Sequence, residues 1–141
     1  MSSRPRQSLT LTLLQAREAA MRFFRPSLNE HGLTEQQWRV IRILRQQGEM
    51  EIYRLADQAC ILKPSMTGVL VRMEAAGLVK RRKAETDQRR VLVELAEKGE
   101  QCFASMSQCM EANYQALQGQ CGEEKLKQLL GLLDELKQVR R

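Results

Sequence analysis

The chain of 141 residues contains one histidine, three prolines, few aromatic residues and no long apolar run. The histidine, His31, stands beside Gly32, and no glycine-rich phosphate loop or metal-ligand spacing accompanies it. Catalysis needs side chains that exchange protons, attack a substrate or hold a metal or cofactor. We therefore expect neither an enzyme nor a cofactor, and we interpret His31 as a residue at a helix end.

Cysteine is present, but without a functional spacing. The four cysteines form no C-x-x-C pair and are too sparse for a secreted disulfide scaffold: Cys60, Cys102, Cys109 and Cys121. Cys102 and Cys109 fall on one predicted helix, about 10 Å apart along its axis, which is too far for a disulfide. We expect all four to be free thiols, and we interpret Cys102 and Cys109 as small buried hydrophobic side chains.

The N-terminal region lacks a signal for export or membrane insertion. Gln15, Arg17 and Glu18 interrupt the apolar residues between positions 9 and 20. A signal peptide or a membrane span needs an unbroken apolar run. We predict a cytoplasmic protein with no membrane contact.

Positive charge is plentiful and clustered. Lysine and arginine number 23 against 17 acidic residues, for a formal charge of +6, and 43% of the residues are hydrophobic. This composition indicates one folded domain with an anionic partner. Six basic residues fall between positions 80 and 90: Lys80, Arg81, Arg82, Lys83, Arg89 and Arg90. A local cluster matters more for phosphate binding than the total charge, although composition alone equally allows a solvated hairpin.

Apolar residues recur at helical spacing along most of the chain. They predict helices over about residues 8–26, 34–48, 51–58, 64–77, 96–117 and 123–139, and strands over 78–83 and 91–95. Thr34 and Gln37 form a capping box, Pro64 suits a first helical turn, and Gly77 suits a helix end. Pro26 is expected to interrupt or kink the first helix.

This order of elements predicts a mainly α fold with a small β-hairpin wing, a winged helix-turn-helix. We assign residues 33–95 to DNA binding and residues 1–32 and 96–141 to a helical dimerisation region. The first and last helices carry apolar seams that the compact middle cannot cover. A homodimer formed through these helices would bury them.

The helix over residues 64–77 is the candidate recognition helix. Met66 and the apolar residues spaced with it are expected to face inward, which leaves the other positions to contact DNA: Lys63, Ser65, Thr67, Gly68 and Arg72. Hydroxyl groups can bond bases or phosphates, the Thr67 methyl can meet thymine, and a glycine lets the backbone approach closely. Such residues are also common on solvated helix faces.

The hairpin offers a second candidate contact with DNA. Asp87 and Arg89 lie near its tip, so the carboxylate can brace the guanidinium as it enters a narrow minor groove. Lys83 and Arg90 flank the pair. A plain surface ion pair is the competing interpretation. A basic hairpin directly after a candidate recognition helix favours DNA contact.

Three segments, taken in order, resemble the MarR family of winged-helix regulators. They are 33–38 (LTEQQW), 72–79 (RMEAAGLV) and 87–90 (DQRR), the last followed by Val91, Val93, Leu95 and Gly99. The resemblance implies an obligate dimer and a palindromic operator in double-stranded DNA. It also implies release when a small molecule, usually a phenolic or aromatic acid, binds between the dimer and DNA-binding regions. The family often has threonine, a helix cap, where this chain has Ala96, and arginine where it has Gly68.

Further segments resemble family members that repress genes for hydroxyphenylacetate breakdown, namely 14–21, 24–26 and 59–68. This implies a repressor of aromatic catabolism that responds to hydroxylated phenylacetates. Such an acid needs a cation for its carboxylate and a flat apolar slot for its ring. Arg17 with Met21, Phe24 and Trp38 could supply them. The competing interpretation places Met21, Phe24 and Trp38 in the core.

Two alternatives stay open. The same fold could sense oxidation through a cysteine, or phenolic stress in general, although no cysteine precedes Cys60. A helical protein-interaction module that binds no DNA would leave the basic hairpin unexplained. An interaction insensitive to salt would favour that module.

Overall fold

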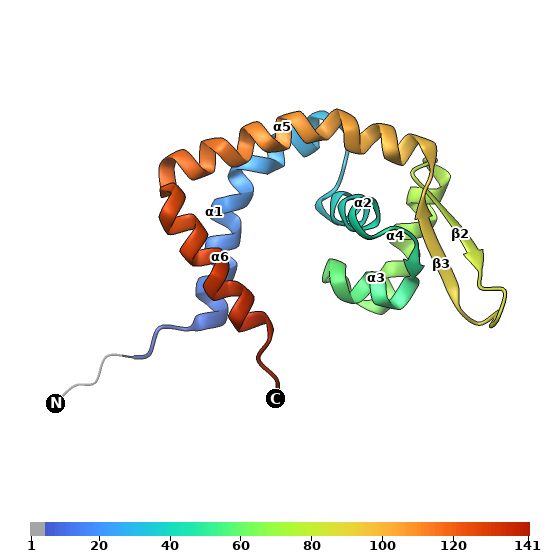
Figure 1. Cartoon of the computed structure of the whole chain (residues 1–141), viewed down its shortest axis with the longest axis horizontal. Helices are drawn as coiled ribbons and strands as arrows, with labels where there is room; N and C mark the ends of the chain where they lie inside the picture. Colours follow the sequence, from blue (N-terminus) through green and yellow to red (C-terminus); the bar gives the residue numbers. More distant parts are fainter. Residues whose placement is uncertain (1–4) are drawn as a thin grey trace. The chain divides into compact units, whose positions relative to one another are not determined.

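The computed structural model describes residues 5–141, and within them it shows a mainly helical chain with a small sheet. The helices are α1 (Leu9–Glu30), α2 (Glu35–Gln47), α3 (Ile52–Ala59), α4 (Lys63–Ala75), α5 (Glu97–Cys121) and α6 (Glu123–Lys137), and the strands are β1 (Met50–Glu51), β2 (Val79–Lys83) and β3 (Val91–Leu95) (Figure 1). The predicted mainly α fold with a β-hairpin wing is confirmed.

The chain divides into two compact units. Residues 27–109 form one, called the central unit, and the segments up to Pro26 and from Met110 onward form the other, called the terminal unit. The predicted assignment of 33–95 to DNA binding, and of 1–32 and 96–141 to dimerisation, is a division by function and stays a prediction. Residues 1–4 of that assignment lie outside the described residues.

Helix α1 continues through Pro26 to Glu30, so of the two effects expected of this proline an interruption is excluded. A proline inside a helix leaves a carbonyl without its N–H partner and costs about 3 kcal/mol. Leu28, two residues further on, is only 1% exposed, and its burial offsets part of that cost. The helix closes at Gly32, whose φ of 66° lets the N–H of Leu33 bond the carbonyl of Leu28.

Local signals set the ends of the next helices. The predicted capping box is present at α2: the Gln37 N–H donates to Thr34 Oγ1 at 3.0 Å, and the Thr34 N–H donates to Gln37 Oε1 at 3.2 Å. Glu51 caps α3 by accepting bonds from the N–H groups of the second and third residues after it. Gly77 follows the end of α4 with a φ of 77°, as predicted.

The sheet is antiparallel, with β3 between β1 and β2. Val79 lies opposite Leu95 and Lys83 lies opposite Val91, so β2 and β3 form the predicted hairpin, whose tip projects beyond the helices of the central unit (Figure 1). Strand β1 is an addition to the prediction. It has two residues, and its Met50 pairs with Val93. A strand this short shows no alternation in sequence.

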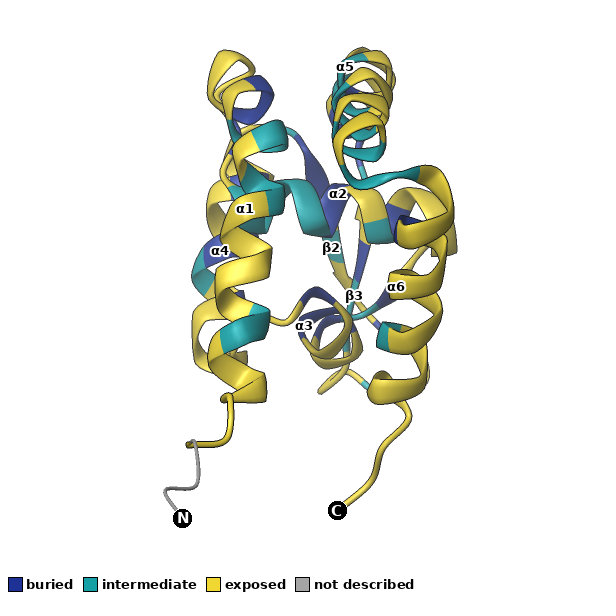
Figure 2. Ribbon diagram, turned by 90° about the vertical axis from the view of Figure 1, so that its left-hand side faces the viewer, coloured by how far each residue is buried: buried dark blue, intermediate teal, exposed yellow. Residues whose placement is uncertain are grey.

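The core of the central unit is formed by side chains from several helices and strands, among them α2, α3, α4 and β3. Large side chains that are less than 2% exposed include Ile41, Leu55, Met66, Leu70, Met73 and Val93. Figure 2 shows buried segments, in dark blue, within α3, α4 and β3. The inward stripe predicted for the recognition helix is therefore confirmed at Met66, Leu70 and Met73.

The terminal unit buries far fewer of its apolar side chains than the central unit does. Leu126 of α6 is 7% exposed, whereas other leucines of the same helix face solvent, among them Leu132 at 63%. Figure 2 shows α1 and α6 mostly in the colour of exposed residues. Within the described residues, no helix is both long and apolar enough to cross a membrane.

The cysteines are unpaired in the described structure. Cys102, Cys109 and Cys121 are partly buried, and Cys60 is exposed. Cys60 ends α3 in the left-handed conformation, with a φ of 55°. It lies in the turn between two helices, where a side chain is at the surface.

Candidate nucleic-acid interface

Helix α4 presents two different faces. Its apolar face is buried through Met66, Val69, Leu70 and Met73. Its other face is exposed at Ser65, Thr67 and Arg72 and partly exposed at Gly68. Since α4 follows α3 after a tight turn, it can pack on the core with one face and enter a DNA groove with the other. The sequence placed these four residues on the outward face correctly.

The first turn of α4 is open and positively charged. Leu62 occupies the N-cap position and offers no side-chain hydrogen bond to the first N–H groups. The Lys63 ammonium lies 5.3 Å from the centre of the Tyr53 ring, which orients it by a cation–π interaction. A helix N-terminus beside a lysine attracts phosphate. Lys63 is thus suited to a backbone contact that sets the position of α4 on DNA.

The glycine in α4 leaves room for an arginine. A Cβ built on Gly68 would lie 3.4 Å from Arg72 Nη1 and 3.8 Å from Nη2. The Arg72 guanidinium therefore covers the place where a side chain at residue 68 would begin. An arginine contact to guanine, which Gly68 itself cannot make, is available to Arg72 from the next turn.

The wing tip holds Arg89 in a braced but solvent-facing position. Asp87 Oδ1 accepts hydrogen bonds from the Arg89 N–H at 3.0 Å and from its Nε at 3.3 Å. The Arg90 N–H donates to the Asp87 carbonyl, and the Ala84 N–H donates to the Arg90 carbonyl, which closes the loop. The Arg89 side chain is 93% exposed. An ion pair this exposed stabilises the fold little, so its clearest consequence is to hold the solvent-facing Arg89 side chain in one orientation.

The basic cluster of the hairpin separates into two groups. Lys80, Lys83, Arg89 and Arg90 are exposed. Arg81, which is partly buried, and Arg82, which is half exposed, form ion pairs with carboxylates outside the hairpin, Glu74 and Glu49, at 3.0 and 2.8 Å. The sequence offers no way to tell these groups apart, because Glu49 is far from Arg82 along the chain. Lys83 and Arg90 are exposed, and their contact with DNA stays a prediction.

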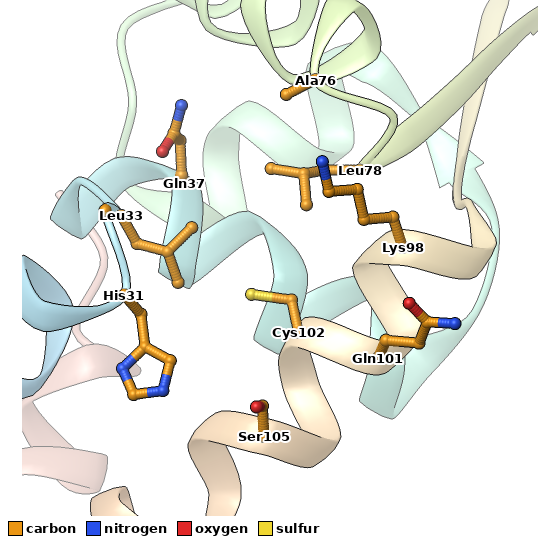
Figure 3. Close-up of a pocket in the computed structure, with 10 residues that line it drawn as sticks. His31, Leu33, Gln37, Ala76, Leu78, Lys98, Gln101, Cys102 and Ser105 are labelled. Atoms are coloured by element: carbon orange, nitrogen blue, oxygen red, sulfur yellow. The ribbon is translucent and has the colours of Figure 1, made fainter.

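A cavity of about 390 Å³ lies within the central unit and was not predicted (Figure 3). It is lined by His31, Gly32, Leu33, Gln37, Ala76, Leu78, Lys98, Gln101, Cys102 and Ser105. Burial raises the pKa of the Cys102 thiol. Among residues 5–141, no three His, Cys, Asp or Glu side chains gather closely enough to hold a metal ion. The lining residues come from distant segments, so no local pattern reveals them.

The four residues predicted to bind a ligand fall in different units. Arg17, Met21 and Phe24 lie on α1 in the terminal unit, and Trp38 lies on α2 in the central unit. Trp38 stacks on Phe103, with ring centres 5.8 Å apart and an angle of 14° between the rings. Trp38 therefore has a packing role in the central unit, and the shared ligand site stays a prediction.

Comparison with known proteins defines the class. Residues 33–91 match the MarR family. The chain is 48% identical over 128 residues to the homoprotocatechuate degradative operon repressor of Escherichia coli, which covers 91% of this chain and 86% of that relative. The protein belongs to the MarR family, whose members are transcriptional regulators, and the resemblance predicted from the sequence is confirmed.

Two solved structures are similar along nearly the whole chain. The transcriptional regulator PA4135 is 74% identical, with a TM-score of 0.94 over 96% of this chain and 100% of that one. NadR in complex with 4-hydroxyphenylacetate is 43% identical, with a TM-score of 0.86 over 99% of both chains.

Proposed function

We propose that this protein is a dimeric repressor of aromatic catabolism genes that binds a palindromic operator and is released by a hydroxyphenylacetate-type acid. The observation that carries the DNA-binding part is the interface on the central unit. It combines the exposed face of α4 with the braced, 93% exposed Arg89 of the wing. In a dimer, two α4 helices would enter successive major grooves, with half-sites about 34 to 36 Å apart and the wings in flanking minor grooves.

The exposed apolar side chains of the terminal unit support the dimer. Leu129, Leu132 and Leu136 of α6 are each at least 36% exposed and recur at spacings of three and four, and Val139, two residues past the end of the helix, is 68% exposed. Such a stripe on a helix needs a partner surface. A second copy of the chain would supply one.

Two relatives support the aromatic effector. One is the homoprotocatechuate degradative operon repressor, and another, NadR, has been solved with 4-hydroxyphenylacetate. Arg17 with Met21, Phe24 and Trp38 stays the predicted site, and the cavity beside Lys98 is a second place where a cation lies near apolar side chains. A ligand at either place can weaken DNA binding only to the extent that it binds the DNA-free conformation of the protein more tightly than the DNA-bound one.

Anisotropy of labelled DNA from upstream of the gene tests the DNA contact. Arg89→Ala should weaken binding by about 1 to 3 kcal/mol. Arg22→Ala, which removes the same charge from the exposed surface of α1, should change it far less. Equal affinity of the two variants would contradict the wing contact, and no binding at low salt would contradict the proposal as a whole.

The effector is tested in the same assay. Release by 4-hydroxyphenylacetate and homoprotocatechuate, but not by salicylate or peroxide, is the expected result. Loss of that response in Arg17→Ala would place the acid at the predicted site, and loss in Lys98→Ala would place it at the cavity. Release by peroxide alone would contradict the aromatic effector and direct attention to the exposed Cys60.

A further inference from the structure

We propose that two ion pairs on neighbouring residues of β2 position the wing on DNA, so that Glu74 with Arg81 and Glu49 with Arg82 are positioning residues of the interface. The inference rests on the proposed contact between Arg89 and DNA. It adds how the hairpin that carries Arg89 is fixed relative to the recognition helix.

Arg81 joins the wing to the recognition helix itself. Glu74, in the last turn of α4, accepts hydrogen bonds from the Arg81 N–H at 3.2 Å and from Arg81 Nη2 at 3.0 Å. The hydrogen bond from the Arg81 side chain lowers the pKa of Glu74, so the carboxylate is ionised at neutral pH. One carboxylate thus binds both the backbone and the side chain of β2, which limits rotation of the strand against α4.

Arg82 joins the opposite face of the same strand to the segment before β1, because successive side chains of a strand alternate. Its Nε and Nη2 donate to Glu49 Oε2 and Oε1 at 3.0 and 2.8 Å. This paired geometry fixes orientation as well as distance, and the bonds to Glu49 raise the pKa of Arg82.

The two pairs lie where the sheet narrows. Leu92 of β3 pairs with Arg82 of β2 on one side and with Glu51, the last residue of β1, on the other. Beyond this point only β2 and β3 continue toward Arg89. A two-stranded ribbon by itself is marginally stable and strongly twisted. Ion pairs on both faces at its base therefore set the direction in which the tip points.

If Glu49 acts only through its charge, Glu49→Arg should change operator affinity in one direction, and if it positions the wing, in the other. The variant therefore distinguishes the two roles. A carboxylate near DNA repels phosphate, so charge alone predicts that Glu49→Arg tightens operator binding. Positioning predicts that it weakens binding by about tenfold, with recovery in the double variant Glu49→Arg/Arg82→Glu, which has the original net charge. Glu85→Arg, on the exposed hairpin tip, is the matched control for charge. Tighter binding by Glu49→Arg, or no recovery in the double variant, would overturn the proposal.

A double-mutant cycle with Arg89 separates this inference from the proposed function. In the Glu49→Arg background, Arg89→Ala should reduce operator affinity much less than it does in the original chain, because the wing is already displaced. Additive losses would overturn the positioning role. No loss from Arg89→Ala in the original chain would overturn the wing contact instead. Glu74→Gln keeps the side-chain shape and should weaken operator binding about threefold. It replaces Glu49→Arg as the test of positioning if that variant fails to fold.

Discussion

The central and terminal units bury their apolar side chains to very different extents. In the central unit, side chains such as Leu55, Met66 and Leu70 are fully enclosed. In the terminal unit, large apolar side chains remain exposed: Leu9, Leu11, Leu14, Leu129, Leu130, Leu132, Leu136 and Val139. Water disfavours such surfaces, and monomeric proteins rarely leave them open. The central unit therefore carries its own core, while the terminal unit leaves apolar side chains uncovered, as the proposed dimer requires.

The largest effect is expected in the central core. Leu55 is 0% exposed, so Leu55→Ala should lower the free energy of unfolding by about 2 to 5 kcal/mol, because it leaves a cavity. Chemical denaturation measures it. Leu62→Ala, at a leucine that is 78% exposed in the same unit, is the control and should change stability little. Similar losses in both variants would mean that burial does not set stability here.

Leu132→Asp in α6 should weaken the association of two chains and leave the stability of the central unit unchanged. Each buried leucine contributes about 1.5 to 3 kcal/mol, and a symmetric dimer loses two, so the dissociation constant should rise by at least tenfold. Sedimentation over a range of concentrations measures this. Leu62→Asp should leave the dimer intact. A dimer unaffected by Leu132→Asp would place the interface elsewhere.

Two glycines of α5, one in each unit, give a matched comparison. A Cβ on Gly99 would collide with the Leu78 carbonyl oxygen and lie 3.0 Å from Leu95 Cδ2, whereas nothing lies within 4 Å of a Cβ on Gly119. Gly99→Ala should destabilise by about 1 to 3 kcal/mol, and Gly119→Ala should stabilise by about 0.5 to 1 kcal/mol. Thermal unfolding gives both values. The same sign for both would contradict the close approach of α5 to Leu78 and Leu95.

The smallest effect concerns thiol reactivity. Burial raises the pKa of Cys102, so at pH 7 it holds less of the reactive thiolate than an ordinary thiol, and the fraction grows as the pH rises. Iodoacetamide labelling followed by mass spectrometry should modify the exposed Cys60 first, with labelling of Cys102 accelerating between pH 7 and 9. Equal rates at pH 7 would show that the cavity beside Cys102 is open to the reagent.

Much of the interface follows from the sequence, because its signals are local. The capping box of Thr34 and Gln37, the helix end at Gly77 and the inward stripe of α4 each depend on residues within one or two turns. Asp87 and Arg89 interact across two positions, and the structure shows the expected hydrogen bond. The spacing left open whether Pro26 interrupts the first helix or lies within it, because the burial of Leu28 that favours continuation depends on contacts elsewhere in the fold.

The sequence by itself determined which faces of the helices are apolar and where the basic hairpin begins, because spacing along the chain specifies both. Only the tertiary structure decided how the charges of that hairpin are used. Glu49 reaches Arg82 across 33 positions, and Glu74 reaches Arg81 from the end of α4, so these two arginines bind carboxylates outside the hairpin. Arg89 pairs with Asp87 at the hairpin tip and is 93% exposed. Charges that are equivalent in sequence acquire different roles because the strength of an ion pair depends on distance in space.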